Sequence, residues 1–186
     1  MIAPVHSLGP GERVCLWTQG CSKHCSGCIS PELQSFRGER IDDSTLSNIV
    51  IRTAQLNSCD GLTISGGDPF EQADALHKFL RSVRNKFNDI LVYTGYELSE
   101  IKAGRSGFAG IECLSLIDVL IDGKYVDSLN EPYCVLRGSK NQTIHFFNKA
   151  LEKKYSEYMN HGRIIESFSH NDTIIVTGIP NRRSSL

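Results

Sequence analysis

The chain has 186 residues, 40% of them hydrophobic, and its 20 basic and 21 acidic residues leave a formal net charge of −1. This length predicts one domain, at most with an appendage, and the balanced charge argues against a protein that binds nucleic acid directly. No apolar run is long enough for a membrane helix and no signal peptide is evident, while seven cysteines in such a chain indicate metal chemistry in a reducing compartment, so we expect a soluble cytoplasmic protein.

The first half of the chain alternates short β-rich runs with helical segments. Residues 13–18 (RVCLWT) predict a strand that leads directly into a cysteine-rich loop, and residues 31–40 have no clear period and predict a further loop. A helix is expected from Asp42, because Asp-Asp-Ser is a helix start and apolar residues follow at helical spacing. Residues 61–65 (GLTIS) then predict a buried strand that ends in Gly-Gly-Asp-Pro.

The second half continues this alternation and then changes character. The last two predicted strands flank residues 169–172 and should form a terminal hairpin. In order, the expected elements are a helix over 76–87, a strand over 90–94, a short helix over 98–102, a strand over 116–122, a polar turn over 137–142, a charged helix over 145–161, and strands over 163–168 and 173–177.

Strands that alternate with helices predict parallel βαβ units, whose ligands bind at the carboxyl ends of the strands. Four polar or glycine-rich segments directly follow predicted strands, so they should meet at one rim of the sheet. These segments are residues 21–28, 66–68, 94–96 and 122–124.

The chain is too short for a complete (β/α)8 barrel, which takes about 250 residues. We therefore predict an α/β fold that forms an incomplete, TIM-like barrel with a C-terminal hairpin extension. The expected division is a core domain over 1–145 and an extension over 146–186, made of a helix and the hairpin and packed on the core. An incomplete barrel has an open flank, which suits a substrate larger than a metabolite.

Three cysteines in a CxxxCxxC motif, Cys21, Cys25 and Cys28, carry the most specific chemical signal. Thiolates select soft metals, and a [4Fe–4S] cluster is usually held by four cysteines. Three ligands would leave one iron open to an exogenous ligand, which makes the cluster a reaction site. The motif resembles the signature of radical S-adenosylmethionine (SAM) enzymes. The alternative is a zinc site that takes His24 or His6 as its fourth ligand.

The remaining cysteines are scattered along the chain and have no partners nearby in sequence. We interpret them as small buried hydrophobic residues, so no second cluster is expected and an electron must come from an external donor. They are Cys15, Cys59, Cys113 and Cys134.

Three strand ends carry candidate contacts to SAM. Bare glycines would let the backbone approach the methionine ammonium, and Asp68 would add a carboxylate for it, although a Gly-Gly at a strand end is also an ordinary turn. Thr94 would offer a hydroxyl or simply end its strand, and Lys124 would balance the SAM carboxylate or lie in a surface turn. The full set is Ser65, Gly66, Gly67, Asp68, Thr94, Asp122 and Lys124.

With these motifs assembled, the chain resembles the family of anaerobic ribonucleoside-triphosphate reductase activating proteins, which are glycyl-radical activases. The TGYEL, LIDGKYV and RGSKNQ blocks are more specific than the others, which many small radical SAM proteins share. The blocks that carry the resemblance are GPGxR at 9–13, GCxxxCxGC at 20–28, SGGDP at 65–69, TGYEL at 94–98, LIDGKYV at 120–126 and RGSKNQ at 137–142.

The resemblance implies a [4Fe–4S] cluster on the three cysteines of the motif, and SAM against the backbone of Gly27, Cys28, Ile29 and Gly67. It implies reductive cleavage of SAM and use of the 5′-deoxyadenosyl radical to make a glycyl radical on an anaerobic ribonucleotide reductase, with a flavodoxin-like electron donor. The alternatives are a radical SAM enzyme that acts on a small molecule or peptide, and a zinc-bound interaction module. Some forty residues after RGSKNQ depart from the family pattern.

Overall fold

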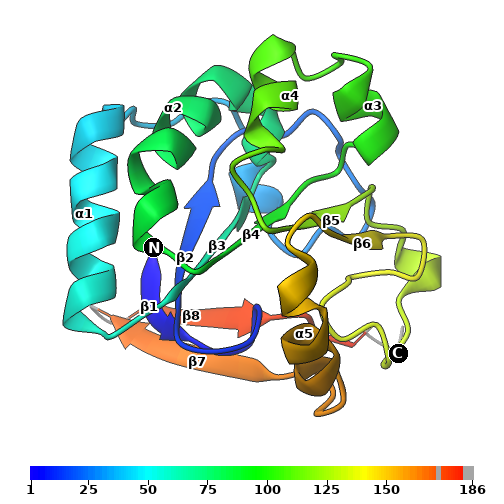
Figure 1. The fold of residues 1–186 in the computed structure, drawn as a ribbon. Helices are drawn as coiled ribbons and strands as arrows, with labels where there is room; N and C mark the ends of the chain where they lie inside the picture. Colours follow the sequence, from blue (N-terminus) through cyan, green and yellow to red (C-terminus); the bar gives the residue numbers. More distant parts are fainter. Residues whose placement is uncertain (171–172, 182–186) are drawn as a thin grey trace.

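The computed structural model describes residues 1–170 and 173–181, and these residues form an open six-stranded sheet with helices and a hairpin around it (Figure 1). The strands lie in the sheet in chain order, with β2 to β5 parallel and an antiparallel strand at each edge. They are β1 (Ile2–Val5), β2 (Arg13–Thr18), β3 (Gly61–Gly66), β4 (Asp89–Tyr93), β5 (Val119–Asp122) and β6 (Thr143–Phe146).

Helices connect the parallel strands, as the alternating pattern predicted. The α-helices are α1 (Asp43–Leu56), α2 (Ala73–Val83), α3 (Leu98–Lys102), α4 (Phe108–Cys113) and α5 (Glu152–Met159). The short 3-10 turns are η1 (Pro31–Leu33), η2 (Pro69–Gln72), η3 (Arg84–Lys86), η4 (Asp127–Leu129) and η5 (Lys149–Leu151). No helix in the described ranges is both long and apolar enough to cross a membrane.

One face of the sheet packs against α1, α2 and α4. Side chains alternate along a strand, so Leu62 and Ile64 of β3 point to this face and are fully buried. The apolar stripe of α2, which includes Phe79 and Leu80, covers them. Helix α1 begins where the sequence predicted, because the side chain of Asp42 accepts a hydrogen bond from the backbone N–H of Thr45 at 2.9 Å.

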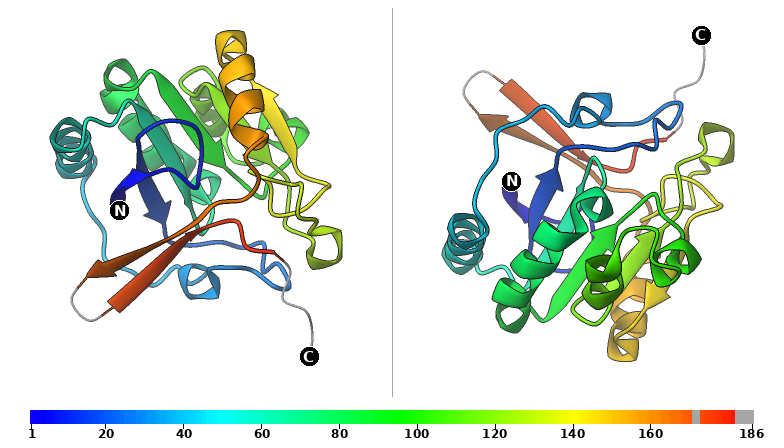
Figure 2. Two further views of the ribbon diagram at one scale, coloured as in Figure 1. Left: turned by 90° about the horizontal axis from the view of Figure 1, so that it is seen from below. Right: turned by 90° about the horizontal axis from the view of Figure 1, so that it is seen from above.

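The opposite face of the sheet is covered by α5 and by the hairpin of β7 (Ile165–His170) and β8 (Thr173–Gly178), which lies on the side away from α2 (Figure 2). Tyr155 of α5 is fully buried against the strands, and Phe168 of β7 packs on the cluster formed by Val5, Leu8 and Cys15. The predicted terminal hairpin is therefore confirmed. Of its expected turn over 169–172, residues 171–172 lie outside the described part.

Three strands and one helix differ from the prediction, and the first of these strands, β1, was not expected. β1 contains a proline, which is disfavoured in central strands but tolerated at the edge that β1 occupies. β6 lies where residues 145–161 predicted a helix; that prediction is wrong up to residue 151, because pairing with β5 holds 143–146 extended. α4 lies between the expected helix over 98–102 and the expected strand over 116–122, where no helix was predicted, and β5 begins at Val119, three residues later than expected.

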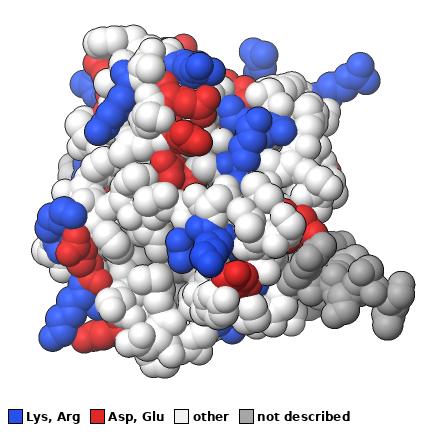
Figure 3. Space-filling view, turned by 90° about the vertical axis from the view of Figure 1, so that its right-hand side faces the viewer, with Lys and Arg blue, Asp and Glu red and all other residues white. Residues whose placement is uncertain are grey.

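The sheet is open, so the predicted incomplete barrel is confirmed only as a mixed α/β fold with a parallel-rich sheet. β6 crosses the division expected at residue 145, and the two-part organisation stays a prediction. Basic and acidic side chains alternate in small groups on the face seen in Figure 3, separated by uncharged surface. This distribution agrees with the net charge of −1.

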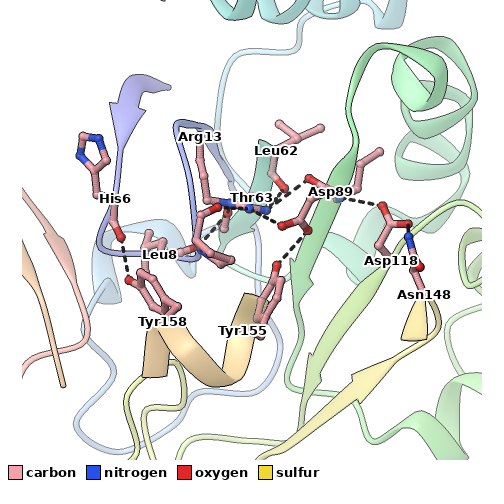
Figure 4. A network of polar contacts seen from close by, with 12 residues as sticks. His6, Leu8, Arg13, Leu62, Thr63, Asp89, Asp118, Asn148, Tyr155 and Tyr158 are labelled. Carbon is pink, nitrogen blue, oxygen red and sulfur yellow. Dashed lines mark hydrogen bonds and ion pairs between the residues drawn. The ribbon is translucent and has the colours of Figure 1, made fainter. Parts of the chain in front are cut away.

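At the amino ends of the parallel strands, a buried ion pair joins three of them. Arg13 of β2 donates to Asp89 of β4 at 2.7 Å and to Thr63 of β3 at 2.6 Å, and Tyr155 of α5 donates to the other carboxylate oxygen of Asp89 at 2.9 Å (Figure 4). The Arg13 and Asp89 side chains are 0% and 1% exposed. The GPGxR arginine is therefore a structural residue, remote from the carboxyl ends of the strands.

His6 fastens the hairpin to the core and should make that attachment sensitive to pH. Its ring nitrogens lie 2.9 Å from Glu166 of β7 and 2.9 Å from Glu12. Hydrogen bonds to Glu166 and then Glu12 raise the pKa of His6 above 6.5. Burial would raise the pKa of Glu166, but hydrogen bonds from Ser7 and His6 outweigh it and lower that pKa below 4.5.

The attachment is expected to be strongest between these two pKa values. The His6 contribution is fully present below pH 6.5 and is lost as the pH rises through its raised folded-state pKa, whereas the Glu166 contribution is lost as the pH falls through its lowered one. The melting temperatures of the wild type and His6→Gln should therefore differ at pH 6 and converge near pH 9. A difference that stays constant over this range would contradict the assignment.

Candidate functional site

The cysteine motif occupies the loop that leaves the carboxyl end of β2, and backbone hydrogen bonds hold its start in place. The N–H groups of Gly20 and Cys21 donate to the carbonyls of Leu33 and Gln34 at 2.8 and 3.0 Å, and the carbonyl of Gly20 accepts from Asp68 N–H at 2.8 Å. The loop is thus fixed on one side by the 31–34 segment and on the other by the end of β3.

The three thiols are free and lie on eight consecutive residues. Cys21 is buried, and burial raises its pKa, while Cys25 and Cys28 are partly exposed. Within residues 1–170 and 173–181, no three His, Cys, Asp or Glu side chains already stand close enough together to hold a metal ion. The three thiols nevertheless have the right chemistry to hold an iron–sulfur cluster. Cluster assembly would remove the thiol protons and order the loop.

The two histidines considered as a fourth zinc ligand are placed differently. His24 is within the loop, with Nδ1 3.2 Å from Oε1 of Gln34. His6 follows β1 beside the amino end of β2, where Val5 pairs with Arg13, at the opposite end of the strand from the cysteines. Both ring nitrogens of His6 are engaged by carboxylates, so the structure does not bring His6 to the thiols.

Gly66 and Gly67 let the end of β3 pass directly beneath the cysteine loop. Gly67 N–H donates to the carbonyl of Thr18 at 2.8 Å. A Cβ on Gly67 would lie 2.4 Å from the carbonyl oxygen of Gly20 and 2.7 Å from that of Leu33, and one on Gly66 would lie 2.2 Å from that of Thr18. The glycines are therefore required for the contact between two backbone segments, whatever else they bind.

Asp68 is buried and uses its carboxylate within the protein. One oxygen accepts from the Phe70 N–H at 3.0 Å and the Thr94 hydroxyl at 2.8 Å, and the other accepts from the Gly95 N–H at 2.9 Å. Burial raises the pKa of Asp68. The Thr94 hydroxyl also accepts from the Tyr96 N–H at 3.1 Å, so Asp68 and Thr94 join the ends of β3 and β4.

The end of β5 completes the rim. Asp122 accepts from the Leu98 N–H at 2.7 Å, and the same carboxylate oxygen lies 2.9 Å from Nε2 of His145. Gly123 N–H donates to the Tyr96 carbonyl at 3.0 Å, which ties this strand end to the previous one. Lys124 is exposed, and its carbonyl accepts from Asn141 at 2.8 Å. The four predicted segments therefore do meet at one edge of the sheet.

The contacts among three rim residues, Lys23, Glu71 and Tyr96, were not predicted from the sequence. Lys23, inside the cysteine motif, places Nζ 3.0 Å from the centre of the Tyr96 ring and 3.9 Å from Glu71. Glu71 also accepts hydrogen bonds from the N–H and hydroxyl of Ser22. Burial raises the pKa of Tyr96 to about 12. These residues belong to three different strand ends, and only the position of Tyr96 within TGYEL hinted at its role.

Gly67→Ala is expected to displace the cysteine loop, because the added methyl group would overlap two carbonyl oxygens. The variant should fold but retain less than half of the wild-type iron after anaerobic reconstitution, measured as iron per chain. Gly104→Ala is the control, since its Cβ would meet nothing within 4 Å although its φ is +79°. That variant should lose only about 1–2 kcal/mol of stability from backbone strain and should keep its iron. Equal iron contents in the two variants would contradict the prediction.

Comparison with known proteins indicates an iron–sulfur protein. Residues 7–145 match the family model described as a 4Fe–4S single cluster domain. The chain is 35% identical over 145 residues to the anaerobic ribonucleoside-triphosphate reductase-activating protein of Haemophilus influenzae, which covers 75% of this chain and 90% of the relative. It is 32% identical to the protein of the same name from Escherichia coli K12, over 74% of this chain and 90% of the relative.

A third relative of that name, from the phage T4, is 32% identical over 141 residues, which cover 73% of this chain and 85% of the relative. The match to the family model covers the cysteine loop and all four strand ends of the rim. These similarities extend over most of both chains, and the chain belongs to the family of anaerobic ribonucleoside-triphosphate reductase-activating proteins, with a 4Fe–4S single cluster domain.

Proposed function

We propose that this protein is a radical SAM activase that generates a glycyl radical on an anaerobic ribonucleotide reductase. The observation that carries the proposal is a loop with three free thiols at the carboxyl rim of a parallel sheet, in a chain whose relatives are named as activators of that reductase. The bound [4Fe–4S] cluster would supply the electron that splits SAM, so that the released 5′-deoxyadenosyl group takes a hydrogen atom from a glycine Cα.

In this proposal, Cys21, Cys25 and Cys28 hold the cluster and leave one iron for SAM. Cys21 is buried, so its thiolate would anchor the cluster against the protein, whereas Cys25 and Cys28 are partly exposed. The chain itself needs no general acid or base for this chemistry. Its part is to orient the cofactors and to exclude competing reactions.

SAM would contact the rim mainly through backbone. Asp68, Thr94 and Asp122 already have partners within the protein, so we propose that they act by holding the strand ends in register. Lys124, whose side chain is exposed, would meet the SAM carboxylate. The proposed backbone contacts are Gly27, Cys28, Ile29, Ser65, Gly66 and Gly67.

The partner follows from the names of the relatives, and the electron donor from the absence of a second cysteine motif in the sequence. We propose a flavodoxin-like donor and a cytoplasmic location, where thiols stay reduced. Residues 1–145 would form the radical SAM core, an incomplete barrel, and residues 146–186 an extension packed on it.

The test is electron paramagnetic resonance of the reductase after incubation with the anaerobically reconstituted protein, SAM and reduced flavodoxin. A glycyl-radical doublet is expected, together with methionine and 5′-deoxyadenosine. If SAM is cleaved but the reductase acquires no doublet, a small-molecule or peptide substrate is favoured instead. A colourless protein that contains zinc and no iron would overturn both.

A further inference from the structure

A series of hydrogen bonds runs from the C-terminal segment to Asp127, which lies beside the cysteine loop. Arg163, between α5 and β7, donates to Oδ1 of Asn130 at 2.8 Å. Asn130 donates to the hydroxyl of Tyr125 at 3.1 Å, and Tyr125 donates to the carboxylate of Asp127 at 2.8 Å. Every bond points the same way, from a guanidinium to a carboxylate, and such aligned bonds strengthen one another.

Asp127, the last residue of this hydrogen-bonded series, lies close to the backbone of the cysteine motif. Asp127 Oδ1 lies 3.0 Å from the point that a Cβ on Gly27 would occupy, and Gly27 has a φ of +74° that favours glycine. Gly27 directly precedes Cys28. Asp127 also lines a shallow cavity of about 380 Å³ with Ser26 and the 125–128 segment. The position of this carboxylate therefore limits where the backbone before Cys28 can lie.

Arg163 begins this hydrogen-bonded series, and its guanidinium joins three segments of the protein. It donates to the carbonyls of Pro180 at 2.7 Å, Cys134 at 3.3 Å and Arg137 at 3.3 Å, in addition to Asn130. The planar guanidinium carries five N–H donors, so it can serve several acceptors at once. Arg163 and Pro180 both lie beyond residue 145, where the match to the family model ends.

We propose that Arg163 is a positioning residue for the cysteine motif, and that through Asn130, Tyr125 and Asp127 the C-terminal segment holds the backbone that precedes Cys28. The catalytic consequence rests on the proposed function, because a loop held in one conformation brings its thiols together around one cluster. The positioning itself needs neither cluster nor SAM, so it is measurable in the iron-free protein.

The experiment measures alkylation of individual cysteines by iodoacetamide in the reduced, iron-free full chain, by mass spectrometry. Arg163→Met removes the anchor, and Tyr125→Phe removes one hydroxyl from the middle of the chain. Each should speed alkylation of Cys28 about fivefold relative to the buried Cys59, the factor expected for one net hydrogen bond. A general loss of stability would speed both cysteines alike and would overturn the proposal.

The matched control is Tyr158→Phe, which removes a different hydrogen bond of the C-terminal segment, from the Tyr158 hydroxyl to the His6 carbonyl at 2.6 Å. It should leave the Cys28 rate unchanged. In the double variant of Arg163→Met and Tyr125→Phe, Cys28 should be alkylated no faster than in either single variant. Both replacements interrupt the same series of hydrogen bonds.

The proposal would be overturned if the two increases in the Cys28 alkylation rate multiplied in the double variant. It would also be overturned if Tyr158→Phe raised that rate as much as Arg163→Met does. If Arg163→Met does not fold, Tyr125→Phe alone decides: a wild-type Cys28 rate overturns it and an increased rate supports it. Because no SAM or reductase is present, failure of the proposed function and failure of this positioning are separate results.

Discussion

Cys25→Ala is expected to abolish cluster assembly, and with it any cleavage of SAM. Thiolates supply the bonds to iron, and alanine has no donor to replace the one lost. The same result is expected for Cys21→Ala and Cys28→Ala. Iron per chain after anaerobic reconstitution should fall to background, and 5′-deoxyadenosine, measured by chromatography after addition of SAM and dithionite, should be undetectable.

Cys59→Ala is the matched control for these variants. Cys59 is 8% exposed and packs in the hydrophobic core with the side chains that line α1 and α2. It should keep its iron and its cleavage activity, with a modest loss of stability from the smaller side chain. Iron retained in Cys25→Ala, or lost in Cys59→Ala, would mean that the ligand assignment is wrong.

Arg13→Met is expected to lower the free energy of unfolding by about 3–5 kcal/mol, because it leaves the Asp89 carboxylate charged and buried without its partner. Arg13 also donates to the carbonyl of Leu62 at 2.9 Å (Figure 4) and to that of Pro10 at 3.1 Å, and both carbonyls would lose this donor. Urea denaturation of the iron-free protein, followed by circular dichroism, measures the change.

Tyr155→Phe serves as the graded comparison, since it removes one neutral donor from Asp89 and keeps the ion pair. Its expected cost is about 1 kcal/mol. The double replacement Arg13→Met with Asp89→Leu removes both charges and should be more stable than Arg13→Met alone. An Arg13→Met protein as stable as Tyr155→Phe would show that the ion pair is not what joins the amino ends of β2 and β4.

Local pattern predicted the central strands well. β2 has the predicted bounds, 13–18, and β3 and β4 lie within one residue of theirs, because buried parallel strands are short apolar runs that glycine and polar residues end. The edge strands β1 and β6 escaped prediction, since only pairing with a neighbour makes such short segments extended.

Part of the candidate site could likewise be predicted from the sequence, and part could not. The convergence of four strand ends followed from alternation of strands and helices, and it is confirmed by the hydrogen bonds that join Asp68 to Gly20, Gly95 to Asp68, and Gly123 to Tyr96. The hydrogen bonds of Asp68 and Thr94 within the protein did not follow from the sequence, and their contacts to SAM stay a prediction. In the folded chain the Thr94 hydroxyl donates a hydrogen bond to the Asp68 carboxylate, which joins the ends of β3 and β4.

The sequence by itself indicated the chemistry: three thiols within eight residues favour a soft metal centre, because the identity of the donor atoms can be read without knowledge of the fold. Only the tertiary structure decided which polar groups at and near the rim contact one another. Lys23 over Tyr96, and Arg163 linked to Asp127, are contacts between residues far apart in the chain. Such contacts depend on sheet register and loop packing, which no local pattern encodes.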